Sequence, residues 1–544
     1  MADSDFPFYR PGRSEYDDNM SRASTVVKRR RKVDEEKFAL GRRGILVFFT
    51  LSVLTLMAAL DGTSLSVALP EIAKELNGTA IEAFWSGTSF LLCSTVFQPS
   101  FASFSNIFGR RPMIIISLIF FCVGAIIAAI ANDFTYMLIG RSIQGVGGGG
   151  IISLSEVIIT DLVPLRWRGQ YFGILSAMWS VGSVTGPILG GGFSENVSWR
   201  WIFYINFPFI GVGAILVILF LNLKLAPSSL VEKLRRIDYF GTVLFVGSMS
   251  SFLIPLSWGG ISYDWNSWHT LVPLCVGGVG LIVFGFYETY FATDPIVPPV
   301  IFQNRTAVAS FIGSVLQGLI LCGSSGMVAG VLITVTGSYR WAIWLGWAFS
   351  TVGLGLMCLI KVDTSMVGWI FLNIVPGLGL GILFPSLGYA VQASADPENL
   401  AIAVAMFSFF RALGQAIGVA VGGVVFQNRM FTNISRYSAL APMAEAYSKD
   451  AAGLVQVIKA MADGADKANL KEAFTDSLRT VWIVCCGVSA VAMVISLLTE
   501  HYDLDRALET NQGLRDDDES INSLKDLEMR TDRRVVTEPR PWAW

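Results

Sequence analysis

The stretch Gly182-Ser-Val-Thr-Gly186-Pro187-Ile-Leu-Gly190-Gly191 lies within residues 170–193, a segment that is otherwise apolar enough to cross a membrane. Glycine and proline weaken helices, and the membrane interior has no water to satisfy the backbone groups they leave free. In a membrane helix, however, small residues let a neighbouring helix approach closely, and proline permits a kink. The stretch therefore predicts a kinked and tightly packed transmembrane helix.

The composition indicates that lipid surrounds most of the chain. Of its 544 residues, 53% are hydrophobic and only 15% are charged, whereas soluble domains carry about 25% charged residues. The seven cysteines and two histidines show no metal-ligand spacing, so we expect no metal, cofactor or disulfide framework. Gly145-Val-Gly147-Gly-Gly-Gly150 matches a dinucleotide pattern but lies inside an apolar segment, and no Walker-type loop occurs. We expect a membrane protein that is neither an enzyme nor a nucleic-acid binder.

Transmembrane spans are predicted wherever about 20 mostly apolar residues follow one another. Twelve such segments occur, at 44–69, 83–104, 112–131, 135–158, 170–193, 201–223, 239–257, 271–292, 341–360, 366–390, 401–427 and 478–499. Residues 307–336 are ambiguous, because they allow one good crossing or two that are too short. We expect the polar residues 1–43 and 500–544 to be disordered cytosolic tails.

The orientation follows from the distribution of lysine and arginine. With the N-terminus inside, the next four inside loops carry nine basic residues, while the outside loops carry only Lys74 and Arg200. Glycosylation sequons at Asn77 and Asn196 then fall outside. A third sequon, at Asn433, is predicted to lie in the long loop before the last span, so all three are candidate glycosylation sites.

A second glycine run, Gly414-Gln-Ala-Ile-Gly418-Val-Ala-Val-Gly422-Gly423, repeats the spacing of the first. A loop marker precedes each run, at Gly109 by 73 residues and at Gly337 by 77. This repeat predicts two homologous halves, as in many transporters. We therefore divide the chain into a first half (44–223), two linker spans with their loops (224–304) and a second half (305–499). The second half lacks about 34 residues where two spans are expected.

Four motifs within residues 43–500 resemble the major facilitator superfamily, and within it the 14-span drug:proton antiporters of the fungal multidrug and toxin efflux type. They are Leu60-Asp61-Gly-Thr63-Ser-Leu-Ser-Val-Ala68-Leu69-Pro70, Ala102-Ser-Phe-Ser-Asn106-Ile-Phe-Gly109-Arg110-Arg111, Arg141-Ser-Ile-Gln144-Gly145-Val-Gly147 and the opening stretch. The resemblance implies an all-α membrane fold of two pseudo-symmetric six-helix halves with two extra central spans. It also implies 12 to 14 spans, a monomer, and exchange of a small-molecule substrate for protons.

The resemblance also assigns roles to the motif residues. Gly182, Gly186, Pro187, Gly190 and Gly191 correspond to the antiporter motif and are expected to act as a hinge. The loop gate corresponds to Asn106, Gly109, Arg110 and Arg111. Asn106 stands where the family has an acidic residue, so it can accept a hydrogen bond but adds no charge to the latch.

Ionisable groups at membrane depth are costly and usually functional. Asp61 and Arg141 both fall in the outer half of the hydrocarbon region, so we expect them to form a proton-coupling cluster with Gln144. Burial favours the neutral form of a carboxyl group and an adjacent arginine favours the ionised form, so changing contact with Arg141 would load and release a proton. A static structural ion pair is the alternative.

Arg411 and Gln415 are candidates for lining the substrate cavity, although Arg411 can equally extend toward the membrane surface. Glu156 and Glu288 lie near helix ends, where we expect them at the membrane interface. The leading hypothesis is a proton-driven exporter in the plasma membrane for apolar or amphipathic molecules such as drugs, toxins or a secondary metabolite. The alternatives are an uptake or vacuolar permease for amino acids or siderophores, and a non-transporting remnant that lacks two spans.

Overall fold

The computed structural model describes residues 40–223, 229–260, 263–320, 333–334, 336–449, 451–504 and 512. Predictions for residues 1–39 and for most of the stretch after 504 lie outside this part of the chain. The contacts divide the chain between Arg43 and Gly44, and the packed helices belong to the unit from Gly44 onward. In the described ranges the regular secondary structure is helical, as predicted.

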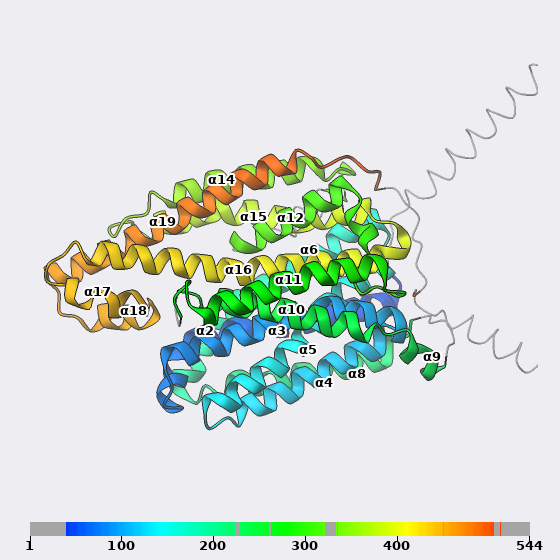
Figure 1. Cartoon of the computed structure of the whole chain (residues 1–544), viewed down its shortest axis with the longest axis horizontal. Coiled ribbons are helices and arrows are strands. Elements are labelled where there is room, and N and C mark those ends of the chain that lie inside the picture. The colour runs from blue at the N-terminus through cyan, green and yellow to red at the C-terminus, as the bar shows by residue number, and fades with distance from the viewer. Residues whose placement is uncertain are drawn as a thin grey trace, which may run out of the picture. The chain divides into compact units, whose positions relative to one another are not determined.

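The long helices of the first half and the linker coincide with the predicted spans. Ten helices of the described part are long and apolar enough to cross a membrane, and Figure 1 shows the long helices lying alongside one another. The first half contains α2 (Arg42–Glu75), α3 (Ala80–Phe108), α4 (Arg110–Ala129), α5 (Phe134–Leu162), α6 (Arg168–Asn196), α7 (Trp201–Tyr204) and α8 (Asn206–Phe220). The linker contains α9 (Leu230–Arg235), α10 (Tyr239–Trp258) and α11 (Trp268–Tyr290).

The second half repeats this arrangement with a shorter beginning. Its helices are α12 (Arg305–Ile320), α14 (Arg340–Met357), α15 (Met366–Ser394), α16 (Leu400–Ile434), α17 (Ala444–Lys449), α18 (Ala451–Ala460) and α19 (Ala465–Ser496). Gly109, before α4, has φ +96°, and Gly337, before α14, has φ +63°. Glycine favours this left-handed region because it has no Cβ. In each half the next two helices then pack together, α4 on α5 and α14 on α15.

The ambiguous segment 307–336 is described at α12, at 333–334 and at 336. The structure describes 16 residues of α12, up to the end of the described range at Ile320. It packs against α15, α16 and α19, and its polar residues Ser310, Ser314 and Gln317 are buried. Polar side chains at membrane depth require such a protein environment. How often residues 321–332 cross the membrane lies outside the described part.

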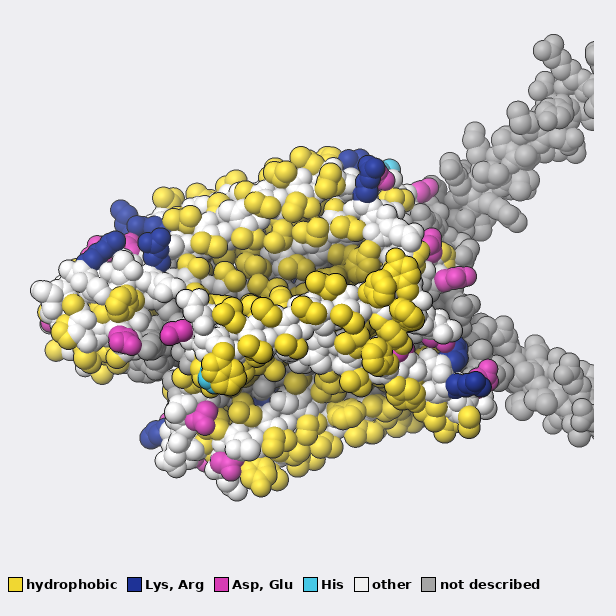
Figure 2. Space-filling view, viewed as in Figure 1, with side chains coloured by type: hydrophobic (Ala, Val, Ile, Leu, Met, Phe, Trp, Pro, Cys, Tyr) yellow, Lys and Arg dark blue, Asp and Glu magenta, His cyan; other side chains and the backbone are white. Residues whose placement is uncertain are grey.

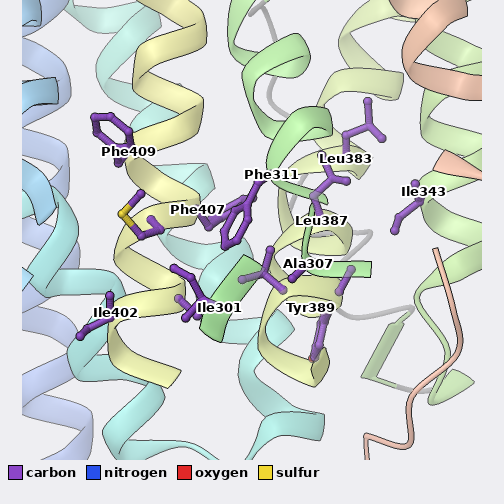
Figure 3. Close-up of a cluster of buried hydrophobic side chains, with 14 of the residues drawn as sticks. Ile301, Ala307, Phe311, Ile343, Leu383, Leu387, Tyr389, Ile402, Phe407 and Phe409 are labelled. Carbon is purple, nitrogen blue, oxygen red and sulfur yellow. The ribbon is translucent and has the colours of Figure 1, made fainter. Parts of the chain in front are cut away.

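Apolar packing joins the linker to the second half. Phe245 of α10 lies 5.6 Å from Phe409 of α16, measured between ring centroids. Figure 3 shows part of the hydrophobic cluster to which both belong, with side chains from η2 (Pro299–Phe302), α12, α14, α15 and α16: Ile301, Ala307, Phe311, Ile343, Leu383, Leu387, Tyr389, Ile402, Phe407 and Phe409. On the surface, hydrophobic side chains cover the long helices and charged ones gather toward their ends (Figure 2), as expected for helices in lipid.

The stretch before the last span is not the long loop that we predicted. Instead, α16 continues to Ile434, and α17, α18 and the start of α19 pack over a hydrophobic cluster that includes Met430, Leu454 and Leu470. Asn433 therefore lies on a helix, is 8% exposed, and donates from Nδ2 to Ser477 Oγ at 3.0 Å. The loop placement of Asn433 was wrong because apolar residues between the polar ones fold the segment into a small helical cap. Asn77 and Asn196 are exposed.

Candidate functional site

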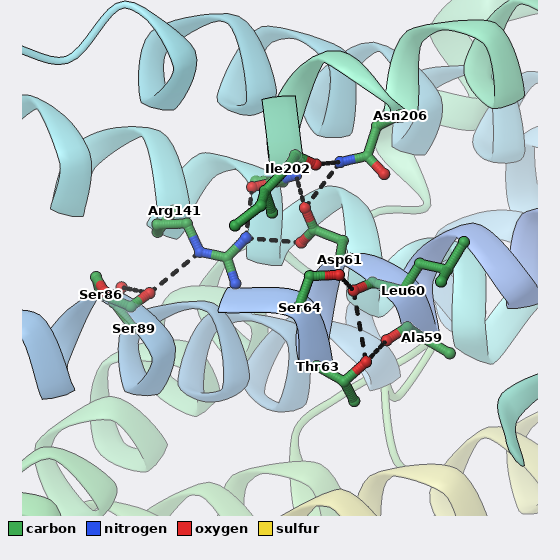
Figure 4. Close-up of polar contacts among 11 residues, drawn as sticks. Ala59, Leu60, Asp61, Thr63, Ser64, Ser86, Ser89, Arg141, Ile202 and Asn206 are labelled. Atoms are coloured by element: carbon green, nitrogen blue, oxygen red, sulfur yellow. Dashed lines mark hydrogen bonds and ion pairs between the residues drawn. The ribbon is translucent and has the colours of Figure 1, made fainter. Parts of the chain in front are cut away.

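Asp61 of α2 is the centre of a buried polar cluster within the first half (Figure 4). Its Oδ2 accepts a hydrogen bond from Arg141 Nη1 at 2.6 Å. Its Oδ1 accepts from Gln144 Nε2 and from Asn206 Nδ2, each at 2.8 Å. All four side chains are buried. The three residues predicted to form a proton-coupling cluster thus lie in direct contact, although α2 and α5 carry them from positions 80 residues apart.

The guanidinium of Arg141 makes further hydrogen bonds and contacts two aromatic rings. Its Nη1 also donates to Gln144 Oε1 at 2.7 Å, and its Nε donates to Ser86 O at 3.1 Å. The guanidinium lies 4.4 Å from the ring centroid of Phe90 and 5.8 Å from that of Phe203. Aromatic faces attract cations, so the two rings add a favourable contact to the hydrogen bonds of the guanidinium.

Asn206 was missed by the sequence reasoning. It begins α8, a strongly apolar helix, and no motif marks it. The available signal was an amide side chain inside an apolar span, because such a group is usually hydrogen-bonded to protein. Its Oδ1 has no hydrogen-bond partner among the described residues.

The glycines of α6 face the helix that carries Asp61. A Cβ on Gly182 would lie 2.5 Å from Ala59 Cβ. A Cβ on Gly186 or Gly190 would lie 2.1 Å from Thr63 Oγ1 or Ser64 O, respectively. At such distances a neighbouring group must shift before a side chain fits, so these three glycines permit the close contact of α6 with α2. We call them the α6 glycine face.

The other two residues of the predicted hinge differ from the α6 glycine face. A Cβ on Gly191 would lie 3.4 Å from Val67 Cγ1, an ordinary contact, so Gly191 is not needed for the approach. Pro187 lies within α6, which continues past it to Asn196. Thr63 Oγ1 donates to Gly182 O at 3.1 Å, which adds a hydrogen bond between α2 and α6.

The loop-gate residues lie at the junction of α3 and α4. Arg110 donates from Nη1 to Asn106 Oδ1 at 2.7 Å and from Nε to Asp161 Oδ2 at 2.9 Å. Arg111 donates from Nη2 to Ile218 O at 2.7 Å. The charge that Asn106 lacks is therefore supplied by Asp161, near the end of α5. The sequence reasoning missed Asp161 because it lies 51 residues from Arg110.

Arg411 of α16 lies against Glu156 of α5, and so joins the two halves. Arg411 Nη2 is 3.8 Å from Glu156 Oε1, and Ser408 Oγ donates to Glu156 Oε2. The guanidinium of Arg411 lies 4.8 Å from the ring centroid of Phe384. Arg411 therefore does not extend to the membrane surface. Gln415, one turn further along α16, is half-buried beside α12.

Glu156 and Glu288 are both buried in protein, and their position at the membrane interface stays a prediction. Each is 4% exposed. Glu156 is covered because α16 of the other half packs on α5. Glu288, near the end of α11, accepts from the backbone N–H groups of Ile296 and Val297 at 3.3 Å. Burial here comes from tertiary contacts that the position of each residue in its helix does not reveal.

The second glycine run packs in the same way as the first. A Cβ on Gly414 would lie 2.0 Å from Val315 O of α12, and one on Gly418 would lie 2.5 Å from Leu319 O. From the other side, a Cβ on Gly318 would lie 2.0 Å from Arg411 O. Gly422 and Gly423 meet nothing within 4 Å. In each half, a glycine-bearing helix is thus pressed against the first helix of that half.

A helical membrane protein built from two such halves, with a buried carboxylate–guanidinium cluster and polar contacts between the halves, is a membrane transporter in architecture. The chain belongs to the Major Facilitator Superfamily, whose family model matches residues 51–419. It is accordingly a transporter and not an enzyme.

Curated fungal proteins resemble the chain over most of its length. It is 48% identical to "MFS transporter L2" of Phoma sp. over 91% of this chain and 88% of that protein. It is 33% identical to "MFS-type efflux pump LUC4" of Fusarium sp. over 88% and 92%. It is 34% identical to the "Acurin A biosynthesis cluster MFS-type transporter" of Aspergillus aculeatus over 89% and 94%.

Proposed function

We propose that this protein is a proton-coupled exporter of small apolar or amphipathic compounds, and that it acts as a monomer in the plasma membrane. The observation that carries the proposal is the pairing of Asp61 with Arg141 on the helix that the α6 glycine face contacts. A protonatable group in direct contact with a close helix–helix interface can link its charge to the arrangement of those helices.

The chemistry of the cluster suits proton exchange. A proton from water binds one oxygen of the Asp61 carboxylate and removes the charge that attracts Arg141. Gln144 and Asn206 then remain as hydrogen-bond partners for the neutral acid. When Arg141 approaches again, the ionised form of Asp61 is favoured and the proton leaves. If uptake and release occur on opposite sides of the membrane, outward movement of substrate can be driven by inward movement of protons.

The proposed direction of transport and class of substrate are inferred from the relatives. The Fusarium protein is named an efflux pump, and the Aspergillus protein is named for a biosynthesis cluster. By similarity, we propose export of a secondary metabolite or a related small molecule. The α6 glycine face supports the same direction, because the corresponding motif belongs to exporters in the family that the sequence resembles.

The shortened second half favours one competing function, that of a non-transporting remnant. From Arg305 to Gly337 there are only 32 residues, against 66 from Arg43 to Gly109 in the first half. A transport assay on the chain as it stands separates the two possibilities, because a remnant would move no substrate.

The test is dye extrusion from yeast cells that lack their own drug pumps. Cells expressing the full chain are loaded with rhodamine 6G, an amphipathic dye, and efflux is followed with and without a protonophore. We expect energised extrusion that stops when the proton gradient collapses, and loss of that extrusion in Asp61→Asn. Extrusion that survives the protonophore would overturn proton coupling. No extrusion of rhodamine 6G or of an anionic and a neutral dye would favour the remnant.

A further inference from the structure

The contact between Glu156 and Arg411 has no role in proton exchange at Asp61, yet it joins buried charges of two different halves. Glu156 belongs to α5 and Arg411 to α16. Their side chains are 5% and 13% exposed, respectively. Burying an ion pair is costly unless hydrogen bonds satisfy both groups. A buried pair that lacks them therefore points to a function other than stability.

The pair is only partly satisfied. The distance of 3.8 Å between Arg411 Nη2 and Glu156 Oε1 is too long for a hydrogen bond. Arg411 Nε has no hydrogen-bond partner among the described residues. Glu156 Oε2, in contrast, is held by the hydroxyl of Ser408. Asp61 and Arg141 differ sharply, because they touch at 2.6 Å and share further donors. The Glu156–Arg411 contact is therefore the looser of the two ion pairs.

The pair lies in a layer where the halves close on each other. Next to Glu156, Val157 of α5 packs in one cluster with Ala102 of α3 and Ala405 of α16, each at most 1% exposed. Ala405 is one helical turn from Ser408. By the positive-inside rule, this layer lies toward the cytosolic ends of α3, α5 and α16.

Arg411 is the charged side chain that faces Glu156 within the described ranges. On α5 itself, Asp161 lies more than a turn further on and pairs with Arg110 of α4. From α6, Arg168 donates to the backbone oxygens of Val163 and Thr160 and to Gln392 of α15. The charge state of Glu156 thus acts mainly on Arg411.

We propose that Glu156 is a second protonation site, and that its charge decides whether α5 and α16 stay together. The ionised carboxylate attracts Arg411 and keeps the layer around Ala405 closed. A proton from water neutralises the carboxylate while Ser408 remains its hydrogen-bond partner, and Arg411 then lacks its counter-charge. The halves separate in this layer, and Glu156 reaches water and can release the proton there.

This inference rests on the proposed proton coupling and completes it. The Asp61 cluster lies wholly within the first half, on α2, α5 and α8, so it does not touch the second half directly. Helix α5, however, carries both Arg141 and Glu156, about 22 Å apart along its axis at 1.5 Å per residue. In an exchange cycle, the protonated carrier opens inward and loses its proton. The deprotonated carrier then closes on this side, as an exporter requires.

The experiment measures opening of the layer without transport. In the full chain, with native cysteines replaced by serine, Ala405→Cys is introduced and the protein is purified into liposomes without a pH gradient or substrate. The labelling rate with N-ethylmaleimide is measured from pH 5 to 8 and divided by the rate in denaturing detergent at the same pH, which removes the intrinsic titration of the thiol. We expect a several-fold rise in relative labelling as the pH falls.

Variants assign the effect to Glu156. In Glu156→Gln, which keeps the shape and an acceptor for Ser408, labelling should be high at every pH, and Glu156→Gln combined with Arg411→Gln should also show no pH dependence. Glu195→Gln, at an exposed position of α6, should keep the parent profile. The proposal is overturned if Glu156→Gln retains the parent profile or labels slowly at every pH. Loss of proton-driven dye export with this profile intact would instead refute the proposed function alone.

Discussion

The hydroxyl oxygen of Thr63 occupies the space that any side chain on Gly186 would need, because a Cβ there would lie 2.1 Å away. The same helix pair meets at Gly190, whose Cβ would lie 2.1 Å from the backbone oxygen of Ser64. A hydroxyl can rotate away, but a backbone oxygen cannot. Gly190 is therefore the stricter of the two positions.

We expect Gly190→Ala to destabilise the protein by about 1–3 kcal/mol, the usual cost of overpacking, and to abolish export. Gly192→Ala is the matched control, since a Cβ at Gly192 meets nothing within 4 Å. Thermal unfolding in detergent and dye efflux check both variants. Equal melting temperatures for the two would show that α6 and α2 separate easily.

The glycines of α16 in the second half allow the same comparison between a tightly packed position and an open one. Gly414→Ala places a methyl group 2.0 Å from Val315 O and should lower the melting temperature, because α12 must move away from α16. Gly422→Ala, with no neighbour within 4 Å, should not. Calorimetry of the purified variants measures the difference. A tolerated Gly414→Ala would contradict the close α12–α16 packing.

Asn206→Ala should destabilise the polar cluster around Asp61. Asn206 Nδ2 donates to the carboxylate, and hydrogen bonds to charged groups contribute about 1.5–3 kcal/mol. Loss of this donor should lower the melting temperature and weaken export. Asn373→Ala is the control, since this half-buried amide on α15 donates to Trp369 O of its own helix and lies outside the cluster. Thermal unfolding in detergent and dye efflux test this, and an unchanged melting temperature would show that Asn206 does not stabilise the carboxylate.

Asp161→Asn should be far more damaging than Asn106→Ala. Arg110 is 3% exposed, and Asp161 is its charged partner at 2.9 Å. Removing one member of a buried ion pair costs about 3–5 kcal/mol, whereas loss of the Asn106 hydrogen bond leaves the charges balanced. Thermal unfolding ranks the two variants. A milder effect for Asp161→Asn than for Asn106→Ala would show that Asn106 is the more important partner of Arg110.

Asn433 should carry no glycan, because its side-chain nitrogen is buried and bonded to Ser477. We expect Asn433→Gln to leave the endoglycosidase mobility shift unchanged. The combination of Asn77→Gln and Asn196→Gln, at exposed positions, should remove it. A shift that disappears with Asn433→Gln alone would show that Asn433 is accessible and that the helical cap does not bury it.

The long apolar helices, the two-half repeat and the identity of Asp61, Arg141 and Gln144 could be predicted from sequence. Lipid imposes long apolar segments, so spans are readable residue by residue. Charged groups inside such segments are costly and therefore conspicuous. The spacing of the glycines revealed the repeat, because only glycine permits the close helix contacts that both halves make.

Tertiary packing decided the partners and the burial of individual side chains. Asn206 and Asp61 lie 145 residues apart, and Arg411 reaches Glu156 across the two halves. Local sequence carries no sign of either contact, nor of the helical cap that buries Asn433. Each depends on which faces of separate helices meet, and that is set by the summed packing of the whole chain rather than by any one segment.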